Sequence, residues 1–102
     1  MLLAEISMWP MDKGESVSPY VARVLDIIDR SGLPYQLGPL GTCIEGEWDE
    51  VMAVVKQCFE ALAADSNRVA ITMKCDWRKN RQGSLEQKVA SVEQKLGRKL
   101  KT

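Results

Sequence analysis

Residues 41–52 read GTCIEGEWDEVM and join a strand directly to a helix. The first part is mostly small and apolar, which is typical of a buried strand. Gly46 supplies the turn, and residues 48–52 begin a helix with acidic side chains in its first turn, where the helix dipole favours negative charge. Glu45 is the exception, because it ends this apolar strand with a carboxylate. Such a carboxylate needs a partner, and a cationic or amine-bearing ligand is one candidate.

The composition limits the kind of protein. With 102 residues, the chain is expected to form one domain, 1–102, around one core. Its 14 Lys and Arg residues balance 14 Asp and Glu residues, so no overall field favours nucleic acid or an anionic membrane. No stretch approaches the roughly 18 apolar residues of a membrane span, and the N-terminus lacks the pattern of a signal peptide. We therefore expect a cytoplasmic protein without nucleic-acid or membrane partners.

Reactive side chains are scarce. The chain contains no histidine, which removes the histidine general base and the imidazole metal ligand. Cys43, Cys58 and Cys75 are odd in number and include no CxxC pair, so we expect reduced thiols that act as small apolar groups. We accordingly expect neither a hydrolase nor a metal site, while chemistry by carboxylates or lysines stays open at this point.

Strands and helices alternate along the chain. Residues 2–9 and 68–77 alternate between two sets of side chains, as half-buried strands do. Apolar residues recur every three or four positions over 17–28 and over 51–62, which indicates two helices with one buried stripe each; the second stripe includes Phe59. The remaining predicted elements are an edge strand over 33–37, a strand over 40–47 and a last helix over 84–96.

This order predicts an α+β fold. Two interleaved right-handed β-α-β crossovers in one antiparallel sheet give the ferredoxin-like βαββαβ sandwich, with strand order 4-1-3-2 and an extra C-terminal helix. Both main helices cover one face of the sheet. The other, open face is expected to show Leu3, Glu5, Ser7 and Trp9 of the first strand and Thr72, Lys74 and Asp76 of the fourth. Large apolar groups on that face predict self-association by sheet stacking. The last helix has a narrow apolar seam that predicts further subunit contacts, formed by Leu85, Val89, Val92 and Leu96.

Three stretches together carry a family resemblance. They are EISMWP with SVSPYVARV (5–24), SGLPYQLGPLGTCIEGEWDEVM (31–52) and DWRKNRQGSLEQKV (76–89). In order and spacing the chain resembles the small ferredoxin-like thiamine-binding proteins, which are related to a two-repeat thiamine or hydroxymethylpyrimidine-binding protein. The resemblance implies a homotetramer, built as a dimer of dimers, that binds thiamine or its pyrimidine precursor without catalysis. Cys43 departs from the aliphatic residue or threonine expected at its position.

A thiamine ligand sets chemical requirements for its pocket. Thiamine carries a cationic thiazolium and an aminopyrimidine, so its pocket needs a carboxylate, short hydroxyls and an aromatic or sulfur surface. We therefore take as candidate ligand-binding residues Glu45, Glu5, Ser7, Thr42, Thr72 and Trp9. Glu45 or Glu5 would meet the amine or the thiazolium, the hydroxyls would make short contacts, and Trp9 would stack.

Each candidate also has a structural alternative. Glu45 and Glu5 could pair with Lys74, and the hydroxyls could be ordinary sheet residues. Trp9 could be an interface or core aromatic. Asp49 serves more simply as an acidic residue at a helix N-terminus.

Two further interpretations compete with ligand binding. Arg78, Lys79 and Arg81 form a basic loop that could meet a phosphate or could simply be solvated. RNA-recognition modules share the element order, but the third strand here has no aromatic residue on which a base could stack. With RNA binding disfavoured, the main alternative to ligand binding is a regulatory or scaffolding module whose open sheet face binds another protein or an amino-acid effector.

Overall fold

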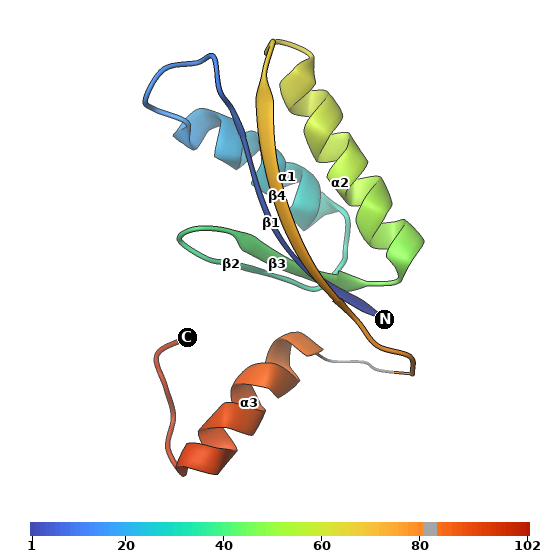
Figure 1. The fold of residues 1–102 in the computed structure, drawn as a ribbon, viewed down its shortest axis with the longest axis vertical. Helices are drawn as coiled ribbons and strands as arrows, with labels where there is room; N and C mark the ends of the chain where they lie inside the picture. Colours follow the sequence, from blue (N-terminus) through green and yellow to red (C-terminus); the bar gives the residue numbers. More distant parts are fainter. Residues whose placement is uncertain (81–83) are drawn as a thin grey trace.

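The structure, a computed structural model, describes residues 1–80 and 84–102 and forms a sheet with helices on one side (Figure 1). Its elements are β1 (Leu2–Pro10), α1 (Ser18–Arg30), β2 (Tyr35–Leu37), β3 (Thr42–Gly46), α2 (Trp48–Ala63), β4 (Val69–Trp77) and α3 (Ser84–Leu96). The described strands form one antiparallel sheet in the order β2-β3-β1-β4. This confirms the predicted ferredoxin-like fold, because the order 4-1-3-2 is the same arrangement counted from the other edge.

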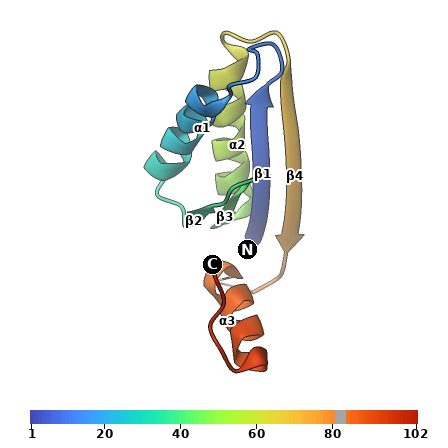
Figure 2. The same ribbon diagram turned by 90° about the vertical axis from the view of Figure 1, so that its left-hand side faces the viewer.

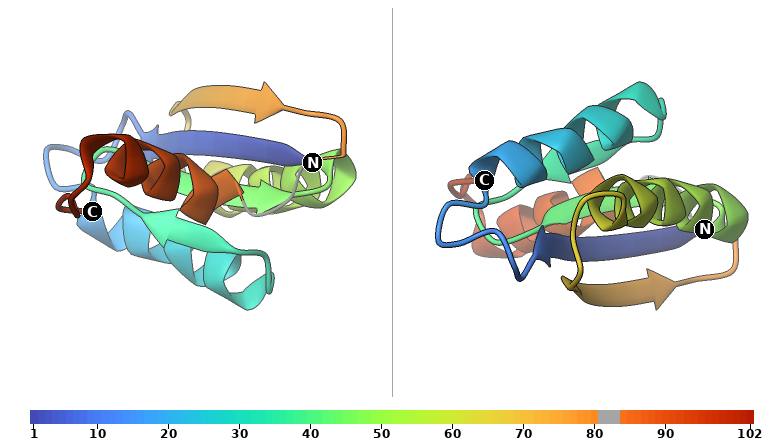
Figure 3. Two further views of the ribbon diagram at one scale, coloured as in Figure 1. Left: turned by 90° about the horizontal axis from the view of Figure 1, so that it is seen from below. Right: turned by 90° about the horizontal axis from the view of Figure 1, so that it is seen from above.

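The core lies between the sheet and the helices α1 and α2, which cover one face (Figure 2). The two helices run side by side in the view from above (Figure 3). In β1, Leu2, Ala4, Ile6 and Met8 are at most 5% exposed, whereas Glu5 between them is exposed. The predicted alternation of this strand is therefore confirmed. The core side chains from the other elements are Val24, Ile28, Ile44, Val51, Val54, Val55, Cys58 and Leu62.

The junction between β3 and α2 explains why the GEWDEV segment bends the chain so sharply. Gly46 is buried, and a β-carbon there would lie 3.3 Å from side-chain atoms of Leu33 and Val51. Glu47 then caps α2 and forms a capping box with Glu50, whose Oε1 accepts the Glu47 backbone N–H at 3.0 Å. The acidic residues of this segment therefore start the helix.

Three details of the prediction are wrong. The edge strand begins at Tyr35 rather than at residue 33, because Pro34 cannot donate a ladder bond; its carbonyl instead accepts the Glu45 N–H at 3.0 Å. β3 begins at Thr42 rather than at residue 40, because the Gly38 N–H bonds the Gly41 carbonyl at 2.8 Å and closes a tight turn. Phe59 is 42% exposed, since it lies at the flank of the buried stripe of α2.

Helix α3 extends beyond the end of the sheet and stays largely apart from the two-layer body (Figures 1 and 2). Its first turns are held by two carboxylates of the sheet. Glu45 Oε2 accepts the Leu85 backbone N–H at 3.0 Å, and Asp76 Oδ2 accepts a hydrogen bond from Lys88 Nζ at 2.5 Å. None of the helices that the described residues form combines the length and apolar character needed to cross a membrane.

Candidate functional site

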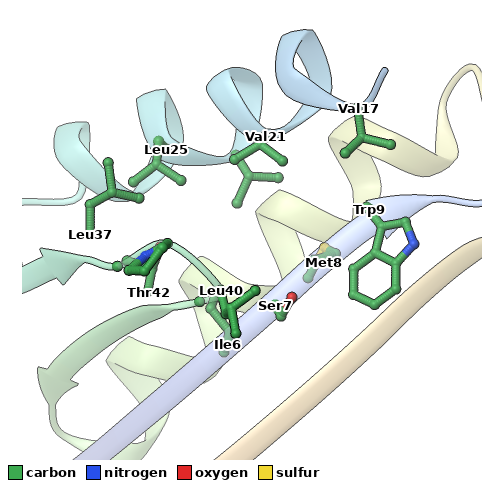
Figure 4. A pocket seen from close by; sticks show the side chains of 14 residues that line it. Ile6, Ser7, Met8, Trp9, Val17, Val21, Leu25, Leu37, Leu40 and Thr42 are labelled. Atoms are coloured by element: carbon green, nitrogen blue, oxygen red, sulfur yellow. The ribbon is translucent and has the colours of Figure 1, made fainter. Parts of the chain in front are cut away.

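A cleft of about 410 Å³ lies between α1 and the sheet (Figure 4). Its volume falls within the range of about 300–1,000 Å³ that is usual for small-molecule sites. The walls are mostly apolar: Val17, Val21 and Leu25 come from α1 and the residue before it, and Leu37 and Leu40 come from the opposite side. The cleft therefore offers mostly apolar surface to a small molecule.

The cleft exists because β3 is shorter than β1. β3 pairs with β1 only as far as Ile6, opposite Thr42, while β4 follows β1 as far as Pro10. Beyond Ile6, none of the strands formed by residues 1–80 and 84–102 pairs with the edge of β1 that would face β3. Ser7, Met8 and Trp9, which follow Ile6 on this strand, line the cleft.

The backbone of Met8 offers one donor and one acceptor at this edge. A β-carbon on Gly41 would lie 3.2 Å from the Ile6 carbonyl oxygen, so that carbonyl points towards the β3 side. Backbone groups of alternate residues in a strand point to the same edge. The N–H and C=O of Met8 consequently point to the β3 side as well, where no described strand pairs with Met8. A ligand with an adjacent donor and acceptor could bond both groups.

A carboxylate lies beside Gly41, one of the residues that line the cleft, although Glu5 itself does not line it. A β-carbon on Gly41, which lines the cleft, would lie 3.2 Å from Glu5 Cγ and 3.5 Å from Glu5 Cδ. Glu5 is exposed, so its charge can meet a ligand or solvent. The buried side chain of Thr42, 4% exposed, adds a hydroxyl to the lining.

The structure brings together only part of the predicted ligand set. Ser7, Trp9 and Thr42 line the cleft, whereas Glu5 lies beside the lining residue Gly41 without lining the cleft itself. The strand register places Glu5, Ser7 and Trp9 on the open face of the sheet but Thr42 on the helix-covered face.

The other two predicted residues lie outside this cleft. Thr72 is the register partner of Ser7 on β4 but does not line the cleft. Glu45 is 5% exposed, lies at the far end of the open face and holds α3 through the Leu85 N–H at 3.0 Å. Neither Glu45 nor Glu5 forms an ion pair with Lys74 within the described residues.

Sequence reasoning missed the α1 wall of the cleft and the 38–41 turn. Val17, Val21 and Leu25 were predicted as ordinary members of a buried stripe, and nothing in a stripe shows that part of it faces an open cleft. The available signal was the GPLG run at residues 38–41, which predicts a turn that cuts β3 short.

Two of the three cysteines, Cys43 and Cys58, are poor nucleophiles. Burial raises the pKa of the Cys43 thiol above its ordinary value of 9.0, and the neighbouring Glu5 carboxylate raises it further. Burial raises the pKa of Cys58 to about 11. Both groups are therefore neutral thiols near pH 7. In residues 1–80 and 84–102, no group of three or more His, Cys, Asp or Glu side chains is arranged to hold a metal ion.

Two basic residues of the predicted basic loop, Arg78 and Lys79, lie within the described part of the chain. Arg78 Nε lies 3.5 Å from Asp76 Oδ1, and Lys79 is exposed. Arg81, the third basic residue of that prediction, lies outside the described residues.

Comparison with known proteins adds a family context. A family model described as thiamine-binding protein matches residues 4–93. UPF0045 protein Mb1933 of Mycobacterium bovis is 42% identical over 96 residues, which cover 93% of this chain and 94% of the relative.

Solved structures show the same fold. Hypothetical protein MJ1052 of Methanocaldococcus jannaschii is 31% identical and superposes with a TM-score of 0.82 over 89% of this chain and 94% of that one. A Thermotoga maritima protein assigned provisionally to thiamine biosynthesis or salvage is 24% identical, with a TM-score of 0.79 over 89% of this chain and 97% of that one. These neighbours confirm the architecture described above.

Proposed function

This chain belongs to the thiamine-binding protein family, and from that membership we propose that it binds thiamine or the related hydroxymethylpyrimidine without chemically changing it. The observation that carries the proposal is the cleft beside the unpaired edge of β1. It combines apolar walls for a flat ring with a small number of polar groups, as ligand sites usually do.

The polar groups match an aminopyrimidine. Its exocyclic amine is a donor and its ring nitrogens are acceptors, so the Met8 C=O can accept from the amine while the Met8 N–H donates to a ring nitrogen. Thr42 adds a hydroxyl within the same cleft. Apolar side chains of α1 and the 37–40 segment then cover the two faces of the ring.

We assign the ligand carboxylate to Glu5. Its side chain lies beside the lining residue Gly41, from which the carboxylate would attract an amine or a cationic ring bound in the cleft. The carboxylate of Glu45 already accepts the Leu85 N–H and lines a separate depression beneath α3. Ser7 and Trp9 complete the proposed site, and Thr72 supports Ser7 from the adjacent strand.

The chemistry of the side chains supports binding rather than catalysis. The chain has no histidine, and burial keeps Cys43 and Cys58 as neutral thiols. The cleft therefore offers no cysteine thiolate or histidine base with which to attack a bound ligand.

We further propose that the chain works as a homotetramer in the cytoplasm. Val92 and Leu96 on α3 are 49% and 51% exposed, and α3 is attached to the body through its first turns. A helix that leaves such a seam uncovered is stabilised when a second subunit buries it. The unpaired cysteines are compatible with a reducing compartment.

Thermal unfolding in the presence of candidate ligands tests the proposal. Thiamine or hydroxymethylpyrimidine should raise the melting temperature progressively with concentration, because each ligand would bind the folded chain and not the unfolded one. Glu5→Gln should reduce the rise, whereas Glu60→Gln, a matched change on the exposed side of α2, should leave it unchanged. No rise with either ligand at millimolar concentration would exclude this function and favour the regulatory or scaffolding alternative.

A further inference from the structure

A second depression continues the cleft past its Trp9 end. It has a volume of about 360 Å³ and is lined by Trp9, Pro10, Met11, Gly14, Glu15 and Val17. Trp9 and Val17 belong to both spaces, and they lie at the end of the main cleft opposite Leu37 (Figure 4). The two spaces are therefore neighbouring compartments that share Trp9 and Val17.

The loop that forms the second depression is fixed to the sheet. The Asp12 carboxylate accepts hydrogen bonds from the Ser66 hydroxyl and from the Asn67 backbone N–H, the latter at 2.7 Å. The Met11 N–H donates to the Arg68 carbonyl, also at 2.7 Å. These contacts hold the loop before α1 against the start of β4 and give the depression a defined wall.

The two compartments differ in charge. Among the described residues, none that lines the main cleft is ionisable, whereas Glu15 is the one charged residue that lines the second depression. Glu15 is exposed and makes no ion pair within the described residues. A depression lined by both an aromatic ring and a carboxylate is a favourable surface for a cation, because the ring face and the carboxylate both attract positive charge.

We propose that the site recognises the unphosphorylated two-ring ligand, with the aminopyrimidine in the main cleft and the cationic thiazolium over Trp9, facing Glu15. This inference rests on the proposed function and adds a specificity to it. Hydroxymethylpyrimidine would leave the second depression unused and bind more weakly than thiamine. A phosphate on the hydroxyethyl arm of the thiazolium would bring negative charge towards Glu15 and weaken binding as well.

Calorimetric titration of the intact protein with three ligands tests the assignment. Thiamine, hydroxymethylpyrimidine and thiamine monophosphate are titrated into the wild type, Glu15→Lys and the surface control Glu60→Lys at one ionic strength. Wild-type protein should bind thiamine about fivefold more tightly than hydroxymethylpyrimidine, the size of a partly exposed cation–aromatic contact. It should bind the monophosphate more weakly than thiamine.

Charge reversal at Glu15 gives the sharpest result. Glu15→Lys should weaken thiamine binding about tenfold, strengthen binding of the monophosphate and leave hydroxymethylpyrimidine unchanged, with the size of both changes falling as salt increases. Glu60→Lys should change none of the three. Trp9→Leu, which keeps an apolar side chain, should weaken thiamine about fivefold while affecting hydroxymethylpyrimidine less.

Two outcomes separate failure of this inference from failure of the function. If hydroxymethylpyrimidine and thiamine bind the wild type equally, or if Glu15→Lys leaves thiamine binding unchanged, the proposed role of the second depression is overturned. Ligand binding in the main cleft would still stand. If neither ligand binds the wild type, the proposed function fails and this inference fails with it.

Discussion

The Glu45 carboxylate accepts a hydrogen bond from the Leu85 backbone N–H at 3.0 Å and so ties β3 to the first turn of α3 across 40 residues of sequence. An N-terminal helical N–H has no partner within its own helix, and a buried carboxylate needs donors. Each group therefore satisfies the other. The position of α3 depends on this contact and on the Lys88–Asp76 ion pair.

Removing the carboxylate should loosen α3. Glu45→Ala is expected to lower the stability of α3 docking by about 2 kcal/mol, because hydrogen bonds to charged groups contribute in this range. Hydrogen exchange of the Leu85 and Val89 amides would measure the change. Glu86→Ala, an exposed glutamate of the same turn, is the control and should exchange as the wild type does. Unchanged exchange in Glu45→Ala would show that the contact does not hold the helix.

A side chain at Gly41 should disturb the rim of the cleft. In Gly41→Ala the new methyl group would lie 3.2 Å from Glu5 Cγ and from the Ile6 carbonyl oxygen, so the Glu5 side chain must move. We expect a loss of stability of about 1 kcal/mol, typical of mild crowding, together with weaker ligand binding.

A double-mutant cycle isolates the Glu5 contribution to this crowding. In a Glu5→Ala background the Gly41→Ala substitution should cost less, because one of the two crowded neighbours is gone. Equal costs in the two backgrounds, measured by urea unfolding, would place the strain on the Ile6 carbonyl alone and would argue against a fixed Glu5 beside Gly41.

The folded chain should lose stability in acid, because protonation of two hydrogen-bonded carboxylates, Asp12 and Asp65, removes their stabilising contribution. The Ser66 hydroxyl and the Asn67 N–H lower the pKa of Asp12 below 3.8, and the hydrogen bond from Arg23 lowers that of Asp65. Because the folded-state pKa values are depressed, this contribution is fully present above the unfolded value of 3.8 and is lost as the pH falls through the lower folded values.

Melting temperature measured between about pH 5 and pH 2 would check this direction. Asp12→Asn removes one of these carboxylates, so its melting temperature should fall less steeply with acid than that of the wild type. A variant with the wild-type slope would contradict the role assigned to Asp12.

The seam of α3 should control assembly. Leu96→Glu places a charge on a residue that is 51% exposed in the single chain and that we expect a second subunit to cover. Light scattering after size exclusion should give about four times the 11.4 kDa chain mass for the wild type and a smaller species for the variant. Gln94→Glu, on an exposed position of the same helix, should keep the wild-type mass. A wild type that is monomeric at micromolar concentration would contradict the proposed tetramer.

Local patterns were sufficient to predict the fold. The alternation in residues 2–9 places Ile6 and Met8 inward and Glu5 outward, and the element order allows one simple antiparallel arrangement. Phe59 was misplaced because helical periodicity defines the centre of a buried stripe better than its flanks. Whether a flank is covered depends on the neighbouring strand, and β4 is an edge strand.

The site was harder to predict because it depends on where two strands stop. The cleft exists because the β1–β3 pairing ends at Ile6 opposite Thr42, and this register is a three-dimensional fact that neither strand encodes alone. Glu45 was conspicuous as a charge in an apolar strand, but its partner is a backbone N–H distant in sequence. Side-chain patterns cannot show such a partner, since every residue except proline carries an N–H.

Amide chemical shifts recorded during titration with hydroxymethylpyrimidine test the central claim most directly, because the ligand is proposed to bond the Met8 backbone in the cleft under α1. The largest shift changes should occur at the Met8 amide and at Gly41 and Thr42, with Lys95 on α3 unaffected. Changes centred on Glu45 and Leu85, or no changes at saturating ligand, would contradict the account.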